Sequence, residues 1–115
     1  MTITIYHNPR CSKSRQTLQL LRDNGHEPRI IEYLKEPPSE VDLARILQML
    51  DKSPRDIIRK GEAAYKDLGL ADASRSDAAL IEAMAANPIL IERPIVINGL
   101  KAALGRPPES VLDIL

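Results

Sequence analysis

Residues 2–34 read TITIYHNPRCSKSRQTLQLLRDNGHEPRIIEYL, and they contain the clearest secondary-structure pattern of the chain. Residues 2–6 alternate between apolar and polar side chains, which is typical of a strand. Residues 12–23 follow as a predicted helix, and Asn24-Gly25 is a common helix stop. Residues 29–34 are rich in β-branched and apolar side chains and predict a second strand. A strand, a helix and a strand within about thirty residues predict a right-handed unit with parallel strands.

The middle of the chain carries helix signals. Ser39 is a predicted N-cap with Asp42 at the capping-box position, and apolar side chains then recur at helical spacing. The elements predicted in this region are a helix after Ser39, a shorter helix over residues 54–60, one helical turn near Tyr65 and a helix from Ser76 to Asn87.

The last third of the chain predicts two strands and a helix. Residues 89–91 and 95–97 are short apolar runs, and Asn98-Gly99 supplies a turn after the second run. A final helix is predicted from Pro107-Pro108, carrying Val111, Leu112 and Leu115. The order β-α-β, helical insert, β-β-α is that of the thioredoxin-like (glutaredoxin-like) fold, an α/β fold with a mixed sheet and here a helical insertion after strand two. We expect residues 1–115 to form one domain.

The charge balance limits the classes of partner. Sixteen basic and sixteen acidic side chains among 115 residues cancel to a net charge of zero, which argues against nucleic acid or an anionic membrane. No apolar run approaches the roughly 20 residues of a membrane span, and the strand-like start does not resemble a signal peptide. A lone cysteine without such a signal fits a reducing compartment. We therefore expect the protein to be cytoplasmic, and separately we expect a monomer.

Cys11 is the single cysteine of the chain, and it lies directly at the start of the first predicted helix. Backbone N–H groups at a helix start stabilise negative charge, so a thiol there is biased toward the thiolate that attacks electrophiles. Arg10 and Lys13 flank Cys11 and are expected to be solvated. The candidate supporting residues are His7, Ser14 and Arg15. The competing interpretation is that Cys11 is a small buried hydrophobic residue, with His7 bonded to backbone and Ser14 part of an ordinary polar helix face.

The absence of a second cysteine shapes any mechanism. Cys11-x-x-Ser14 resembles a dithiol redox motif whose second cysteine is replaced, so no internal disulfide can form. A covalent intermediate on Cys11 must therefore be resolved by a thiol from another molecule. One cysteine and two histidines give no metal-ligand cluster, and we expect no metal.

Three arginines are candidates for binding an oxyanion, because arginine makes bidentate contacts with such groups. Arg59 lies at the end of the predicted helix over residues 54–60, Arg93 directly precedes Pro94, and Arg106 lies in a Gly-Arg-Pro-Pro loop. A neighbouring proline reduces the chain entropy lost on binding. In thioredoxin-like folds a cis-proline precedes the second hairpin strand, beside the cysteine loop. Pro94 is the candidate, and this would bring Arg93 close to Cys11; an ion-paired or solvated arginine is the competing interpretation at each position.

Three segments together resemble the glutaredoxin-coupled arsenate reductase family: residues 7–15 (HNPRCSKSR), 92–96 (ERPIV) and 105–109 (GRPPE). The resemblance runs over essentially the whole chain. It implies a thioredoxin-like fold and the reduction of arsenate to arsenite, with Cys11 as the nucleophile. It implies that the oxyanion-binding residues are Arg59, Arg93 and Arg106, with His7 and Ser14 near the thiol. It further implies that glutathione, as co-substrate, and glutaredoxin supply the electrons, with no bound cofactor.

The resemblance is to the short chromosomal branch of that family. Plasmid-type members have a small residue before the cysteine and Gly-Thr after it, and some carry an extension beyond the position of Leu115.

Two alternatives stay open. A glutathione-dependent thiol reductase or deglutathionylase would use Cys11 and Ser14 on a mixed disulfide and would be indifferent to Arg106→Ala. A transcription regulator of the same fold would bind RNA polymerase, but that branch typically carries a Cys-x-x-Cys switch, which this chain lacks.

Overall fold

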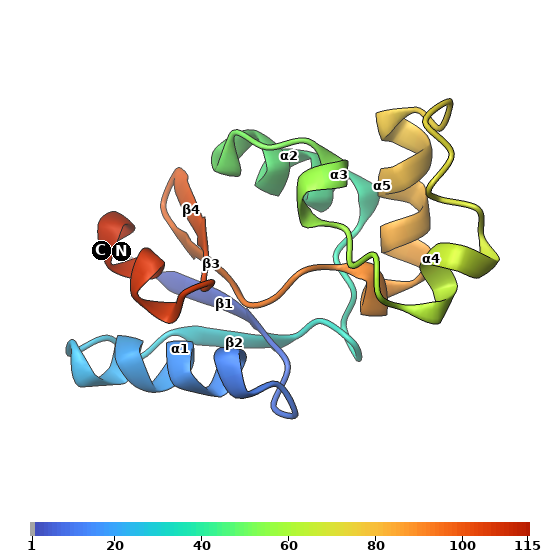
Figure 1. Cartoon of the computed structure of the whole chain (residues 1–115). Coiled ribbons are helices and arrows are strands. Elements are labelled where there is room, and N and C mark those ends of the chain that lie inside the picture. The colour runs from blue at the N-terminus through green and yellow to red at the C-terminus, as the bar shows by residue number, and fades with distance from the viewer. Residues whose placement is uncertain (1) are drawn as a thin grey trace. The chain divides into compact units, whose positions relative to one another are not determined.

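Residues 2–115 are described by a computed structural model, in which the chain forms two compact units. The sheet unit consists of the chain up to Glu36 together with the chain from Arg93 onward, and the inserted unit is residues 37–92 (Figure 1). The insertion begins after the second strand, as predicted. That residues 1–115 behave as one domain stays a prediction.

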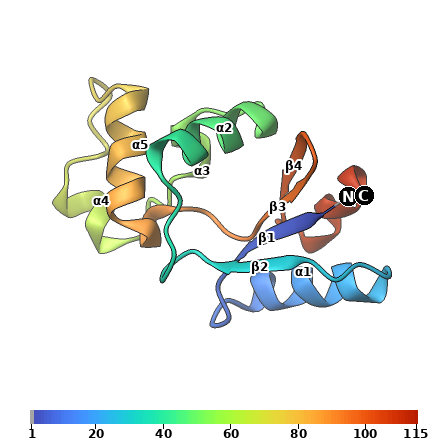
Figure 2. The same ribbon diagram turned by 180° about the vertical axis from the view of Figure 1, so that it is seen from behind.

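The sheet unit contains a four-stranded mixed sheet in the order β2-β1-β3-β4. The strands are β1 (Ile3–His7), β2 (Arg29–Glu32), β3 (Ile95–Asn98) and β4 (Lys101–Leu104). β1 pairs with β2 in parallel, while β1 with β3 and β3 with β4 are antiparallel (Figure 2). The predicted α/β mixed sheet of the thioredoxin-like fold is confirmed.

One face of this sheet is covered by α1 (Ser12–Asp23) and η2 (Pro108–Ile114), which also contact each other. α1 has the bounds that the sequence predicts. The core of the sheet unit is an aliphatic cluster drawn from both strands and helices, namely Ile3, Ile5, Leu21, Val96 and Val111. This cluster anchors α1 on β1, and so fixes the loop that joins them.

The inserted unit is helical. Its elements are α2 (Glu40–Leu50), α3 (Pro54–Ile57), α4 (Ala63–Asp67), α5 (Asp77–Ala86) and η1 (Pro88–Leu90). The predicted capping box is present, since Asp42 N–H donates to Ser39 Oγ and Ser39 N–H donates to an Asp42 carboxylate oxygen. α5 buries Leu80 and Met84 and contacts α2 and α3. Neither here nor elsewhere in residues 2–115 does a helix combine the length and apolarity needed to cross a membrane.

The predicted helix over residues 54–60 is wrong in length, because α3 ends at Ile57. Ile58 instead pairs with Ile91 in an antiparallel bridge, and Arg59 N–H donates to Leu90 O at 2.7 Å. Consecutive β-branched residues favour this extended pairing over another helical turn. Arg59 therefore lies beyond the helix, on an extended segment.

The predicted pair of strands at the end of the insertion is also partly wrong. Residues 88–90 form the 3₁₀ helix η1, and the hairpin is made by β3 and β4 around Asn98-Gly99, where Gly99 has φ +64°. Alanine has low strand propensity, so Ala102 and Ala103 gave no strand signal. β2 ends at Glu32, two residues earlier than predicted, because the chain turns there.

The last helix is the 3₁₀ helix η2, and its three-residue repeat determines which side chains it buries. A 3₁₀ helix repeats every three residues, so Val111 and Ile114 share one face and pack on the core. Leu112 and Leu115 lie off this face and are 38% and 39% exposed.

Candidate active site

Cys11 is the N-cap residue of α1 and has an extended backbone. Its N–H donates to Asn8 O at 3.0 Å, and its own carbonyl accepts from Arg15 N–H at 3.0 Å. Cys11 is buried, with 8% exposure, but it is not a member of the aliphatic cluster of the sheet unit. Its side chain makes no capping bond and the first turn of α1 has no acidic residue. The N–H groups at this helix start are therefore available to a negative charge.

Three buried side chains shape the loop between β1 and α1. Ser14 Oγ lies 2.6 Å from His7 Nδ1 and accepts from Asn8 N–H at 3.0 Å. Ser14 is fully buried, and His7 and Asn8 are each 6% exposed. The hydroxyl thus ties the end of β1 to the first turn of α1. Because every partner is buried, loss of this hydroxyl would leave polar groups unsatisfied.

Burial lowers the pKa of His7 below 6.5, since the charged imidazolium loses hydration there. Glu32, the partner of His7 in the β1–β2 register, opposes this effect, while Arg15 and Arg22 add to it. The lowered pKa favours the neutral ring of His7.

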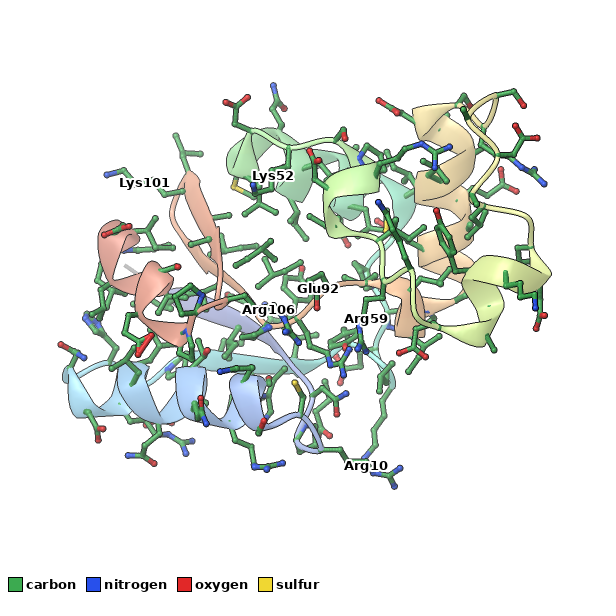
Figure 3. All side chains as sticks on the ribbon, viewed as in Figure 1. Arg10, Lys52, Arg59, Glu92, Lys101 and Arg106 are labelled. Atoms are coloured by element: carbon green, nitrogen blue, oxygen red, sulfur yellow. The ribbon has the colours of Figure 1, made fainter. Side chains whose placement is uncertain are left out.

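Two further contacts brace the loop. Asn8 Oδ1 accepts from Arg10 N–H at 3.0 Å, and Arg15 Nη1 donates to Pro9 O at 2.9 Å. Arg15, Arg10 and Lys13 are exposed, and Figure 3 shows Arg10 extending away from the ribbon. Sequence reasoning missed Asn8 as a site residue. An Asn placed just after a strand and before a proline is the available signal, because Asn side chains accept from backbone N–H groups two residues on.

Arg93 and Arg106 lie at the end of the sheet that carries the cysteine loop. β1 runs antiparallel to β3, with Tyr6 opposite Ile95, and β3 runs antiparallel to β4, with Ile95 opposite Leu104. The loop after β1, the segment before β3 and the loop after β4 therefore share one end of the sheet. Arg106 Nε donates to Arg93 O at 2.9 Å, which joins the loop after β4 to the segment before β3.

Pro94 follows a cis peptide bond, as predicted, and so does Pro107. Pro94 precedes β3, which is the first strand of the hairpin and not the second.

Gly105 lets the loop after β4 approach α1. A Cβ at this position would lie 2.5 Å from Thr17 Oγ1 and 2.6 Å from Pro94 Cγ, both closer than van der Waals contact allows. Gly105 N–H also donates to Pro94 O at 2.9 Å. Thr17 lies one turn beyond Ser14 on the same buried side of α1. Sequence reasoning missed both Gly105 and Thr17, because a close approach between distant segments leaves no local pattern.

Arg59 belongs to the inserted unit, unlike the other candidate residues. Its guanidinium forms ion pairs with Glu62, at 2.9 Å from Nη1, and with Glu92, at 3.8 Å from Nε. Arg59 and Glu92 are labelled in Figure 3. All three side chains are about one quarter exposed. Sequence reasoning missed both glutamates, although Glu62 is three residues from Arg59, a spacing at which side chains meet on a helical turn.

The loop between β1 and α1 lines a cavity. A cavity of about 280 Å³ is lined by residues 7–10 together with Glu32, Leu34 and Lys35. Basic and acidic side chains meet there, with Lys35 Nζ 3.8 Å from Glu32 Oε1. Among residues 2–115, no three His, Cys, Asp or Glu side chains gather in a way that could hold a metal ion.

Comparison with known proteins gives a consistent result. The ArsC family model matches residues 6–114. The uncharacterised protein YfgD of Escherichia coli K12 is 53% identical over 98% of this chain and 96% of its own length. The arsenate reductase of Rhizobium meliloti is 49% identical over 100% of this chain and 82% of its own length. A solved structure described as arsenate reductase from Vibrio cholerae has a TM-score of 0.97 and 51% identity, covering 100% of this chain and 98% of that chain. This chain therefore belongs to the ArsC family, the family of these arsenate reductases.

Proposed function

We propose that this protein reduces arsenate to arsenite, with Cys11 as the nucleophile and with glutathione and glutaredoxin as the source of electrons. The observation that carries the proposal is the position of the single cysteine. Cys11 is the N-cap residue of α1 and makes no side-chain capping bond. It lies at the sheet end that also carries Arg93 and Arg106. The relatives named arsenate reductase support the same reaction. We place it in the cytoplasm, since a lone reduced thiol requires a reducing compartment.

In the first step, Arg93, Arg106 and Arg59 hold the charged oxygens of arsenate near the N-terminus of α1. Guanidinium groups suit this task because they bind tetrahedral oxyanions through paired N–H donors. The Cys11 thiolate attacks arsenic(V) and forms a sulfur–arsenic bond. One arsenate oxygen takes up protons and leaves as water.

In the second step, an external thiol completes the reduction. A glutathione thiolate attacks Cys11 Sγ, and the electron pair of the sulfur–arsenic bond remains on arsenic, which leaves as arsenite. Cys11 and glutathione are then joined in a mixed disulfide. A glutaredoxin thiolate attacks the glutathione sulfur of that disulfide and frees the Cys11 thiolate. External thiols are required because the chain has no second cysteine.

Phosphate should compete with arsenate for this site, because the two anions share shape and charge. It should not turn over, since thiols do not reduce phosphorus(V). Phosphate is therefore a useful probe of binding without chemistry.

The test is arsenate-dependent NADPH oxidation coupled through glutathione reductase and glutaredoxin, with arsenite measured directly. We expect the wild-type protein to produce arsenite, and we expect Cys11→Ser to reduce the rate to the uncatalysed level, because the hydroxyl is a far weaker nucleophile than a thiolate.

Arsenite production by Cys11→Ser near the wild-type rate would remove Cys11 from the mechanism. Turnover of a glutathionylated substrate without arsenate, unaffected by Arg106→Ala, would instead favour the thiol reductase.

A further inference from the structure

We infer that Glu62 is an internal competitor of the substrate: its carboxylate occupies the Arg59 guanidinium in the free protein and so limits how tightly the site binds a doubly charged oxyanion. This inference rests on the proposed function, in which Arg59 holds the oxyanion.

The first support is the contact itself. Arg59 Nη1 lies 2.9 Å from Glu62 Oε1, a distance typical of a charge-assisted hydrogen bond. The two side chains are 23% and 28% exposed, so solvent screens them less than it screens a surface pair. An oxyanion that binds the same nitrogen must displace this carboxylate or share the guanidinium with it.

The second support is that the backbone fixes this arrangement. Arg59 N–H donates to Leu90 O at 2.7 Å, and Glu92 N–H donates to Ile57 O at 2.8 Å, on either side of the Ile58–Ile91 bridge. Arg59 and Glu92 therefore lie on paired extended segments. Glu62 is the N-cap residue of α4, three residues after Arg59. The fold therefore holds the backbones of all three residues where their side chains can reach one another.

The third support is the local charge. One guanidinium faces two carboxylates, because Glu92 Oε1 also lies 3.8 Å from Arg59 Nε. Both carboxylates oppose a second anion at this guanidinium, and they oppose a dianion more than a monoanion. Glu62 rather than Glu92 is assigned the competing role because its contact is almost an ångström shorter.

The test is the affinity of phosphate for Glu62→Gln, measured by calorimetry near neutral pH. Glutamine keeps the size of the side chain and can still accept a hydrogen bond from Arg59, but it removes the charge. We expect phosphate to bind at least about threefold more tightly than to the wild-type protein. Glu82→Gln is the matched control, since it removes one exposed carboxylate of the same unit and should leave the affinity unchanged.

Arg59→Ala, alone and combined with Glu62→Gln, separates this inference from the proposed function. We expect Arg59→Ala to weaken phosphate binding and to abolish the effect of Glu62→Gln. If Arg59→Ala weakens binding while Glu62→Gln leaves it unchanged or weakens it too, the proposed role of Arg59 stands and the competitor is overturned. If neither variant changes the affinity, Arg59 is not an oxyanion ligand and the inference fails, while the reaction at Cys11 is still tested by Cys11→Ser. An equal gain in Glu82→Gln would reduce the effect to bulk charge and overturn the inference.

Discussion

His7 shows how one buried side chain couples the cysteine loop to pH. Burial lowers its pKa below 6.5, so the folded protein disfavours the protonated ring. The unfolded chain has no such restriction. As pH falls below 6.5, the unfolded state therefore binds a proton that the folded state does not, and stability decreases. More than about one pH unit above that value both states hold the neutral ring, and this contribution no longer changes with pH.

We expect His7→Gln to reduce the loss of stability between about pH 7.5 and 5.5, as measured by urea unfolding at each pH. Glutamine can still hydrogen-bond to Ser14 but does not titrate. The difference from wild type should stay below about 1.4 kcal/mol per pH unit, the limit for one proton. His26→Gln is the matched control, because His26 is the only other histidine and lies outside this loop. A similar pH dependence of stability in all three proteins would contradict the assignment of this effect to His7.

The residues around Cys11 also show what a sequence can and cannot reveal about a site. The order of residues 7–15 singled out Cys11, His7 and Ser14, because strand, loop and helix start are all local features. Asn8 was missed, although its backbone and side chain together bond Ser14, Arg10 and Cys11. Its importance depends on the closed form of the loop, which the order of residues alone does not define.

At the scale of elements, α1 joins the cysteine loop to the Arg106 loop. Ser14 on its first turn contacts His7, and Thr17 on the next turn faces Gly105. Thr17 Oγ1 itself donates to Lys13 O at 2.8 Å, so it is fixed within the helix and cannot easily retreat. The position of Arg106 therefore depends on how closely Gly105 approaches this helix.

We expect Gly105→Ala to destabilise the protein by about 1–3 kcal/mol, because the added methyl group would overlap Thr17 and Pro94. Denaturant unfolding measures the loss, and phosphate affinity should also fall because Arg106 moves with the loop. Gly61→Ala is the matched control, since a Cβ there would meet nothing within 4 Å. Equal stability of the two variants would show that the loop adapts at little cost.

The elements that the sequence predicts well are those with strong local signals. Residues 12–23 combine apolar periodicity with an Asn-Gly stop, and the helix has those bounds. The wrong predictions fall where tertiary pairing decides. Ile58 pairs with Ile91 instead of extending a helix, and β4 exists because β3 pairs with it rather than because alanine favours strands.

At the scale of the molecule, charge is divided unevenly between the two units. Nine of the sixteen basic residues but only six of the sixteen acidic residues lie in the sheet unit. The net charge of zero therefore combines a basic sheet unit with an acidic inserted unit. The candidate anion ligands Arg93 and Arg106 belong to the basic unit.

We expect phosphate to raise the melting temperature of the wild-type protein, because a ligand that binds only the folded state stabilises it by about 2.7 kcal/mol at one hundred times its Kd. Arg93→Ala should lose most of this rise. Arg29→Ala, which removes an exposed arginine of the same unit, should retain it. Equal rises in all three proteins would indicate a general salt effect rather than binding at Arg93.

The pairing of β1 with β3 has a consequence for the newly made chain. Ile5 lies opposite Val96, so the centre of the sheet joins two residues that are about ninety positions apart in the chain and are made at different times. Synthesis at about 5–20 residues per second separates the two by roughly 5 to 20 seconds. During that interval the apolar face of the first strand and helix has no permanent cover, and it is the surface that a ribosome-associated chaperone would meet.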